Sequence, residues 1–254
     1  MSPTIIAHAI RTDRCASPSL PWPPDDQRGR ETTMRIGILG TGTLAAALAE
    51  GWARAGHEIV VGGRSPAKAR DLADRLGPDV RAAEPREVVT GRDAVLLAVA
   101  WDGVEDMLRA VGAADGSLAG TPLIDPTNPV DHGVGALLTG PGESMAERIA
   151  GLAPGAHVVK AFHLFPSDQW TGPGETAVTV AMCGDDPAAL EVVGELARAV
   201  GGAPAVLGGL DRARQLEEVA GFVIGLVFAG HDPGAAVPHM PSAAAQEPRR
   251  QDDR

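Results

Sequence analysis

The sequence is poor in several residue types, and each shortage excludes a class of protein. Its 254 residues include no tyrosine, four phenylalanines and four tryptophans, so any core has to be built from Ala, Val, Leu and Ile. The two cysteines, Cys15 and Cys183, are too few for a disulfide framework or a zinc site, and the histidines have no metal-ligand spacing. We therefore expect no metal site and a reducing compartment, the cytoplasm.

Basic charge and long apolar runs are also scarce. Lys and Arg number 22 against 33 Asp and Glu, a net charge of −11, which argues against a nucleic-acid or anionic membrane partner. No apolar run reaches the roughly 18–20 residues of a membrane span, and the longest, residues 219–230, predicts a buried helix. The segment 5–10 is too short, and lacks the preceding basic region, for a signal peptide.

The two ends of the chain differ in composition from its middle. Residues 1–33 are rich in Pro, Ser, Asp and Arg, without helical or strand periodicity, and predict a disordered arm. Met34 directly precedes the first strand pattern, which makes it a candidate for the true start of the chain. Residues 231–254 predict a flexible tail. Hydrophobic residues make up 44% of the chain, enough for one folded domain over residues 34–230.

Within this domain, short apolar runs alternate with amphipathic stretches. Strands are expected over 35–39, 58–61, 93–98, 122–125, 157–162, 177–183 and 203–207. Helices are expected over 43–55, 66–77, 104–111, 144–152 and 187–200, and from an Asp211 cap to about 229. This alternation predicts an α/β fold of the Rossmann type: a doubly wound, mostly parallel sheet with helices on both faces and no separate all-helical domain.

A glycine-rich turn follows the first expected strand and opens the first helix. Its residues Gly40, Thr41, Gly42, Thr43, Leu44 and Ala45 fit the pattern G-x-G-x-x-A. Gly40 permits a tight turn, Gly42 lets the backbone approach a pyrophosphate, and Ala45 allows close packing of helix on strand. The helix N-terminus offers free N–H groups to the pyrophosphate. The turn therefore predicts dinucleotide binding, the alternative being a structural turn in a domain that binds none.

The end of the second expected strand indicates which dinucleotide binds. NAD sites usually carry a carboxylate there, but this strand is followed by Gly63, Arg64 and Ser65, with Lys68 one turn into the helix. A guanidinium, a hydroxyl and an ammonium suit a ribose 2′-phosphate, which Arg can bind through two charge-assisted hydrogen bonds. We therefore predict NADP(H), the alternative being an ordinary solvated basic face beside a helix cap.

Five stretches together carry a family resemblance over roughly residues 34–229. They are residues 34–69, AVLLAVAW, DPTNP, ESMAERIAGLAPGAHVVKAFHL and GGLDRARQLEEVA. In order and spacing they resemble the NADP oxidoreductases that use the deazaflavin coenzyme F-420 (F420). They also resemble the cytosolic reductase domain of the six-transmembrane metalloreductases.

The resemblance implies a role for each matching position. The phosphate loop would be lined by Thr41, Thr43 and Leu44, and the 2′-phosphate held by Arg64, Ser65 and Lys68. The turn Ala98, Val99, Ala100, Trp101 would lie along the ribose, although the family often has proline where this chain has Ala100. The resemblance further implies that Asn128 and Pro129 approach the nicotinamide and that Ala161, Phe162 and His163 face the second redox partner.

Other chemistry has weaker signals. Lys160 and His163 end an expected strand and are the catalytic candidates, as proton donors to a carbonyl or imine, with a structural or ribose-contacting role as the alternative. Trp101 and Trp170 could wall a flat ring or cover the core, and Cys183 is interpreted as packing. Hydride transfer needs positioning more than acid–base groups.

Three functions remain open. The first is an NADPH-dependent oxidoreductase that moves hydride between NADP(H) and a second flat redox cofactor, F420 or a flavin. The alternatives are direct NADPH-dependent reduction of a small carbonyl or imine, and a non-catalytic NADPH-binding module. Because one domain face cannot easily cover residues 219–230, we expect a homodimer with this helix near the interface.

Overall fold

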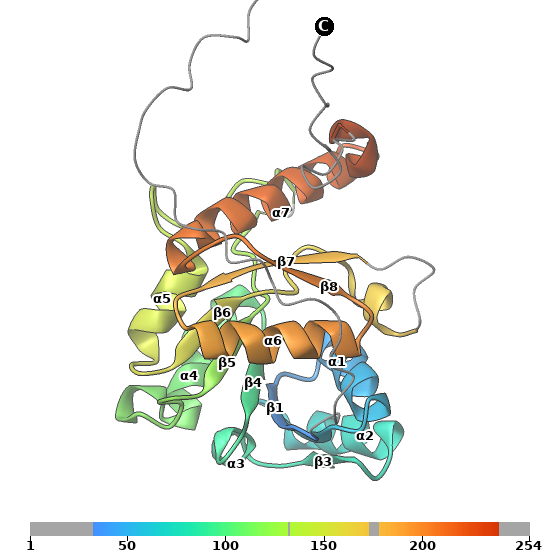
Figure 1. Ribbon diagram of the computed structural model, residues 1–254, viewed down its shortest axis with the longest axis vertical. Coiled ribbons are helices and arrows are strands. Elements are labelled where there is room, and N and C mark those ends of the chain that lie inside the picture. The colour runs from blue at the N-terminus through green and yellow to red at the C-terminus, as the bar shows by residue number, and fades with distance from the viewer. Residues whose placement is uncertain (1–32, 132, 173–177, 239–254) are drawn as a thin grey trace, which may run out of the picture. The chain divides into compact units, whose positions relative to one another are not determined.

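The computed structural model describes residues 33–131, 133–172 and 178–238 (Figure 1). The expected disordered arm over 1–33 therefore lies outside the described residues, except for Thr33. The expected tail is described only to residue 238, and it contains a short 3-10 helix over Pro233–Ala236.

One eight-stranded sheet organises the domain, in the order β3-β2-β1-β4-β5-β6-β7-β8. The strands are β1 (Arg35–Leu39), β2 (Glu58–Gly62), β3 (Val80–Ala82), β4 (Ala94–Leu97), β5 (Pro122–Asp125), β6 (His157–Lys160), β7 (Thr179–Gly184) and β8 (Ala203–Val206). The first six are mutually parallel, and their order is that of the dinucleotide-binding Rossmann fold. Strand β7 runs antiparallel to β6, and β8 is parallel to β7. The predicted fold class is confirmed.

Seven α-helices cover the sheet in two layers. They are α1 (Thr43–Arg54), α2 (Pro66–Leu76), α3 (Pro85–Val89), α4 (Val104–Val111), α5 (Met145–Leu152), α6 (Pro187–Ala199) and α7 (Ala213–Phe228), among the described residues. The apolar faces of α1, α2 and α6 form one core cluster with one face of the sheet. The other cluster joins α3, α4, α5 and α7 to the opposite face. Strands buried on both faces explain why their sequences are continuous apolar runs.

Several predicted boundaries need correction. Strand β6 ends at Lys160 instead of 162, because Phe162 has a φ of +59° and cannot continue an extended strand. Asp211 does not cap α7: it lies in a 3-10 turn over Leu210–Arg212, and α7 starts after it without a side-chain cap. The sequence prediction also missed β3 and α3, which are only three and five residues long.

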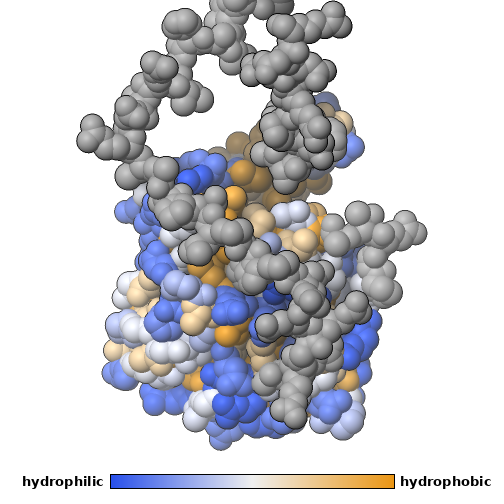
Figure 2. Space-filling model, in the orientation of Figure 1, coloured by the Kyte–Doolittle hydropathy of each residue, from blue (hydrophilic) through white to orange (hydrophobic). Residues whose placement is uncertain are grey.

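Helix α7 is buried at its start and exposed at its end. Glu217 and Ala220 are buried, whereas Phe222, Val227 and Phe228 are 50%, 56% and 61% exposed. Apolar residues gather over this helix on the surface (Figure 2). The expectation of a buried helix over 219–230 is therefore wrong for this chain alone. No helix in the described part of the chain is both long and apolar enough to cross a membrane.

Candidate functional site

The parallel strands end at one edge of the sheet, and most of the predicted site residues follow those ends. The glycine turn comes after β1, Gly63 and Arg64 after β2, and Ala98 after β4. Asp125 and Lys160 are the last residues of β5 and β6 and pair in register. An edge of this kind, outside the carboxyl ends of parallel strands, is where α/β proteins bind their ligands.

The glycine turn is packed so tightly that its first glycine cannot carry a side chain. Gly40 has a φ of +133°, and a Cβ there would lie 2.0 Å from the carbonyl oxygen of Ala98. Its N–H donates to the carbonyl of Gly62 at 2.8 Å, which joins the turn to the end of β2. By contrast, a Cβ on Gly42 would meet no atom within 4 Å. Gly42 therefore faces open space.

Helix α1 begins beside this open space, and no side chain caps its first N–H groups. Gly42 is the N-cap residue, and no side-chain hydrogen bond caps the described helix start. Gly42 and Thr43 are exposed, while Thr41 and Leu44 are half-buried. Uncapped N–H groups at a helix N-terminus carry a partial positive charge. The turn thus fits a pyrophosphate, since it offers both room and donors.

Three residues after β2 form a polar rim beside this turn. Ser65 caps α2, since its Oγ accepts from the Lys68 N–H at 3.4 Å. The side chains of Arg64 and Lys68 are exposed and form no hydrogen bond or ion pair with the rest of the described chain. Both cations are therefore available to an external anion. The end of β2 carries the glycines Gly62 and Gly63 and no acidic residue that could repel that anion.

The turn after β4 leads into a cleft. Ala98 and Val99 are half-buried, and Ala100 is exposed and extended at φ −61°, so the absence of proline there leaves its backbone regular. Trp101 follows in a 3-10 helix and lines a cleft of about 680 Å³. Pro129, Thr139 and the start of α5 form other parts of the wall. Trp101 thus borders a space beside the sheet edge.

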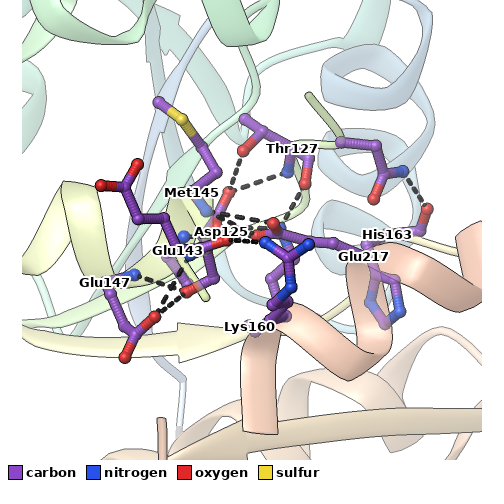
Figure 3. A network of polar contacts seen from close by, with 12 residues as sticks. Asp125, Thr127, Glu143, Met145, Glu147, Lys160, His163 and Glu217 are labelled. Atoms are coloured by element: carbon purple, nitrogen blue, oxygen red, sulfur yellow. Dashed lines mark hydrogen bonds and ion pairs between the residues drawn. The ribbon is translucent and has the colours of Figure 1, made fainter. Parts of the chain in front are cut away.

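A fully buried group of charges lies at the ends of β5 and β6 (Figure 3). The Lys160 ammonium is 3.0 Å from Asp125 Oδ2 and 2.9 Å from Glu217 Oε1, and all three side chains are 0% exposed. It also donates to the Thr127 carbonyl. Its three hydrogens are therefore used within the protein.

Asn128 and His163 are hydrogen-bonded to each other close to this group of charges. Asn128 Nδ2 donates to the His163 carbonyl at 2.6 Å. Both ring nitrogens of His163 and the Oδ1 of Asn128 are buried without a hydrogen-bond partner among the described residues. Burial, and then the nearby Lys160 charge, lowers the pKa of His163 to about 3, so its ring is neutral near pH 7. Unpaired buried polar atoms are rare in folded proteins and here leave bonding capacity for a ligand.

The peptide before His163 is strained. Phe162 is the one described non-glycine residue with a positive φ, and its ring packs edge-on against Trp52 and Trp170. Such strain costs about 1–3 kcal/mol and persists only where the surroundings enforce it. For Trp101 and Trp170 the sequence left open a ring wall or a core position: Trp170 is part of the core, whereas Trp101 lines the cleft.

Cys183 is buried in the core. Burial raises the pKa of the Cys183 thiol to about 12, so it is an unreactive thiol in the core. No cluster of three or more metal-ligating side chains occurs within 33–131, 133–172 and 178–238.

Sequence reasoning missed three residues of the buried charge group. Asp125 and Thr127 belong to the DPTNP stretch at a strand end, which could have marked them as site residues. Glu217 lies in the stretch GGLDRARQLEEVA, but nothing there indicated its partners, because it accepts from the backbone N–H of Met145, 72 residues away. In the sequence it is one of several charges on an amphipathic helix.

Comparison with known proteins agrees with this geometry. The family described as "NADP oxidoreductase coenzyme F420-dependent" matches residues 35–129. A structure from Arthrobacter sp. FB24, assigned as an F420-dependent NADP reductase, superposes with a TM-score of 0.68 and 30% identity, over 78% of this chain and 96% of that one. The chain belongs to the F420-dependent NADP oxidoreductase family. Members of this family are NADP-dependent oxidoreductases.

Two curated relatives show how the family varies in length. The F420-dependent NADP reductase of Methanothermobacter marburgensis is 29% identical over 214 residues, which cover 76% of this chain and 92% of that protein. The metalloreductase STEAP3 of Rattus norvegicus is 32% identical over 193 residues, 73% of this chain. The match spans only 36% of STEAP3, so the similarity concerns about a third of that relative.

Proposed function

We propose that this protein transfers hydride between NADP(H) and a flat redox ring, F420 or a flavin. The observation that carries the proposal is the juxtaposition at one sheet edge of an open phosphate turn, two unpaired cations and a tryptophan-walled cleft. NADPH, when bound, supplies the hydride from its nicotinamide ring. The protein supplies binding and orientation.

The nucleotide half of the proposal rests on the groups after β1 and β2. The pyrophosphate would lie over Gly42 against the N–H groups of α1, with Thr41, Thr43 and Leu44 around it. Arg64 and Lys68 would bind the 2′-phosphate, with Ser65 holding the helix start that carries Lys68. Ala98, Val99 and Ala100 would border the ribose. The groups that would bind the phosphates, the N–H groups of α1 and the side chains of Arg64 and Lys68, are uncapped or exposed in the described chain.

The acceptor half rests on the lack of an acidic proton donor among the described groups at the strand ends, since the one N–H of a neutral His163 ring is only a weak acid. Lys160 has used its three hydrogens, and the His163 ring is neutral because its pKa is about 3. Reduction of a carbonyl leaves charge on one oxygen, which needs a proton in the transition state. A flavin or deazaflavin ring spreads that charge over its own atoms. The site therefore favours a flat ring over a carbonyl.

A stopped-flow assay of NADPH oxidation tests the proposal. Oxidation is followed with F420, FMN, FAD and a panel of carbonyls and imines. Rapid single-turnover oxidation by one of the three rings, and none by the panel, is expected. Oxidation only by a carbonyl or imine would favour direct reduction. Tight NADPH binding with no oxidation by any acceptor would indicate a non-catalytic binding module.

The proposed assembly is a homodimer through the end of α7. The sequence from Val219 to Gly230 carries no charge, and Val134 and Leu138, 70% and 52% exposed, are further exposed apolar residues. The last residues of the sequence, RRQDDR, are too polar to match this surface. A second copy of the same helix can match it about a two-fold axis. Light scattering should report a dimer for the parent and a monomer for Phe228→Asp; a monomeric parent would refute the assembly.

A further inference from the structure

The Lys160 ammonium binds oxygens of three residues. They are Asp125 at the end of β5, the Thr127 carbonyl in the loop after it, and Glu217 in α7. Asp125 uses its other oxygen to accept from the Thr127 N–H at 2.8 Å and from Thr127 Oγ1 at 2.6 Å. The N–H, the hydroxyl and the carbonyl of Thr127, in the loop after β5, are therefore all hydrogen-bonded.

Glu217 extends the same group to helix α5. Its carboxylate accepts from the Met145 N–H at 3.0 Å and from the Ala146 N–H at 3.3 Å. The negative carboxylate thus occupies the positive end of α5. Two carboxylates and one ammonium are enclosed here with every charge bonded, an arrangement that tolerates removal of one partner poorly.

The contacts of Lys160 lead directly to the proposed nicotinamide site. Thr127, whose carbonyl it binds, is followed at once by Asn128 and Pro129. In the other direction, Lys160 precedes the strained Phe162 and His163 by two and three residues. The bond from Asn128 Nδ2 to the His163 carbonyl closes the two turns on each other. Lys160 is therefore connected to both turns, to one through the Thr127 carbonyl and to the other along the backbone.

We propose that Lys160 is a positioning residue, which sets the Thr127–Asn128–Pro129 turn against the nicotinamide, and that it is not a proton donor. This inference rests on the proposed function, with the nicotinamide taken to lie against Asn128, whose buried Oδ1 has no partner among the described residues. The ammonium acts through the Thr127 carbonyl, since its side chain is 0% exposed and cannot touch a substrate. An apolar side chain of the same length would fill the space but leave that carbonyl without its donor.

Paired variants separate positioning from stability. Lys160→Met alone leaves two buried carboxylates without a counter-charge and is expected to fold poorly. Lys160→Met with Glu217→Gln, and Lys160→Gln with Glu217→Gln, remove one charge of each sign. Glu217→Gln alone is the matched control, because it retains Lys160 and its bond to Thr127. Thermal unfolding shows which variants are folded.

The expected result is a slower reaction with little change in nucleotide affinity. In the folded double variants, single-turnover hydride transfer should fall about 10–100-fold below Glu217→Gln, because a displacement of about 1 Å at a reacting centre can cost two orders of magnitude. The NADPH Kd should change less than about threefold, since Arg64 and the α1 N-terminus are intact. The pH–rate profile should keep its shape.

Each other outcome overturns the inference. A double variant as fast as Glu217→Gln shows that Lys160 positions nothing, and loss of the basic limb of the pH profile identifies it as a proton donor. Unfolding of both double variants assigns it a purely structural role. If the parent reduces no acceptor, the proposed function fails separately. The fluorescence of bound NADPH then decides: an altered nicotinamide spectrum in the double variant supports positioning, and an identical one overturns it.

Discussion

The two ends of the site hold their charges in opposite ways. At the proposed nucleotide end, Arg64 and Lys68 are exposed and unpaired. The turn after β1 contains Gly40 and Gly42, and Gly42 faces open space. At the other end, Asp125, Lys160 and Glu217 are fully buried and bonded to one another. The first arrangement leaves its bonding capacity for a ligand that arrives with its own charge.

The second arrangement serves geometry. Buried paired charges contribute little net stability compared with apolar residues, but they fix the groups that they bond. Unused bonding capacity remains there on Asn128 Oδ1 and the two nitrogens of His163. Affinity for the nucleotide and alignment of the reacting rings are therefore expected to be separable by mutation.

The largest expected effect distinguishes the two glycines of the turn, Gly40 and Gly42. Gly40→Ala should destabilise the fold by at least about 3 kcal/mol, because its Cβ would overlap the Ala98 carbonyl at a positive φ. Gly42→Ala should change the free energy of unfolding by less than about 1 kcal/mol, since it has φ −79° and open space. Its NADPH affinity should nevertheless fall more than about tenfold, as the methyl fills the pyrophosphate position.

Chemical denaturation and nucleotide titration measure the two effects separately. Retained NADPH affinity in Gly42→Ala would move the pyrophosphate away from this turn. Unchanged stability in Gly40→Ala would show that the turn can open by shifting β4.

Next in size is the effect of Arg64 on nucleotide choice. Loss of a charge-assisted bond to a phosphate costs about 1.5–3 kcal/mol, which corresponds to roughly 10–150-fold in affinity. Arg64→Ala should weaken NADPH by this factor and NADH by less than about threefold. Arg70→Ala is the matched control, an exposed arginine on helix α2, which begins just after Arg64. Calorimetric titration with both nucleotides checks this, and equal weakening of both would exclude a phosphate role for Arg64.

A smaller effect is expected from His163 as the pH falls. Its folded pKa is about 3 because of burial, whereas an unfolded imidazole titrates near 6.5. Between these values the unfolded state binds more protons, so the free energy of unfolding decreases as pH falls. The contribution is about 2 kcal/mol between pH 7 and pH 5.

His163→Asn should remove this part of the pH dependence. Urea unfolding of parent and variant at several pH values between 4 and 8 measures it. Parallel curves for the two proteins would mean that the imidazole is hydrated or bonded in solution.

The smallest effect belongs to a surface pair far from either end of the site. The hydrogen bond from the Arg35 side chain lowers the pKa of Asp93, but the two side chains are 53% and 38% exposed. Asp93→Asn should cost at most about 1 kcal/mol at pH 7. That cost should vanish as pH falls below the Asp93 pKa, since the parent carboxylate is then protonated. A cost comparable to that of Lys160→Met would contradict the distinction between exposed and buried pairs.

The strand, turn and helix starts at the proposed nucleotide end were predictable because their signals are local. The turn from Gly40 to Ala45, the Ser65–Pro66 helix start and the missing carboxylate after β2 all lie within about 30 residues of one another. The first strand and the helix over 104–111 were predicted to the residue.

The other end depends on contacts between distant segments. Lys160 and His163 were named as candidates, but the partner that neutralises Lys160 from α7 was not. The reversal of β7 had no signal, since a strand's sequence does not record its direction. The positive φ of Phe162 is enforced by Trp52 and Trp170 across the core, and no local pattern predicts it.

The pairing of Asp125 with Lys160 also bears on how the sheet selects its register during folding. The two residues are direct neighbours in the parallel ladder of β5 and β6. A slip of one residue along β6 would turn Lys160 to the face where Val159 now packs beneath α6, and would leave Asp125 beside an apolar neighbour. An unpaired charge on each side of the sheet is far costlier than a displaced methyl group. The mismatched sheet is therefore penalised before any ligand binds.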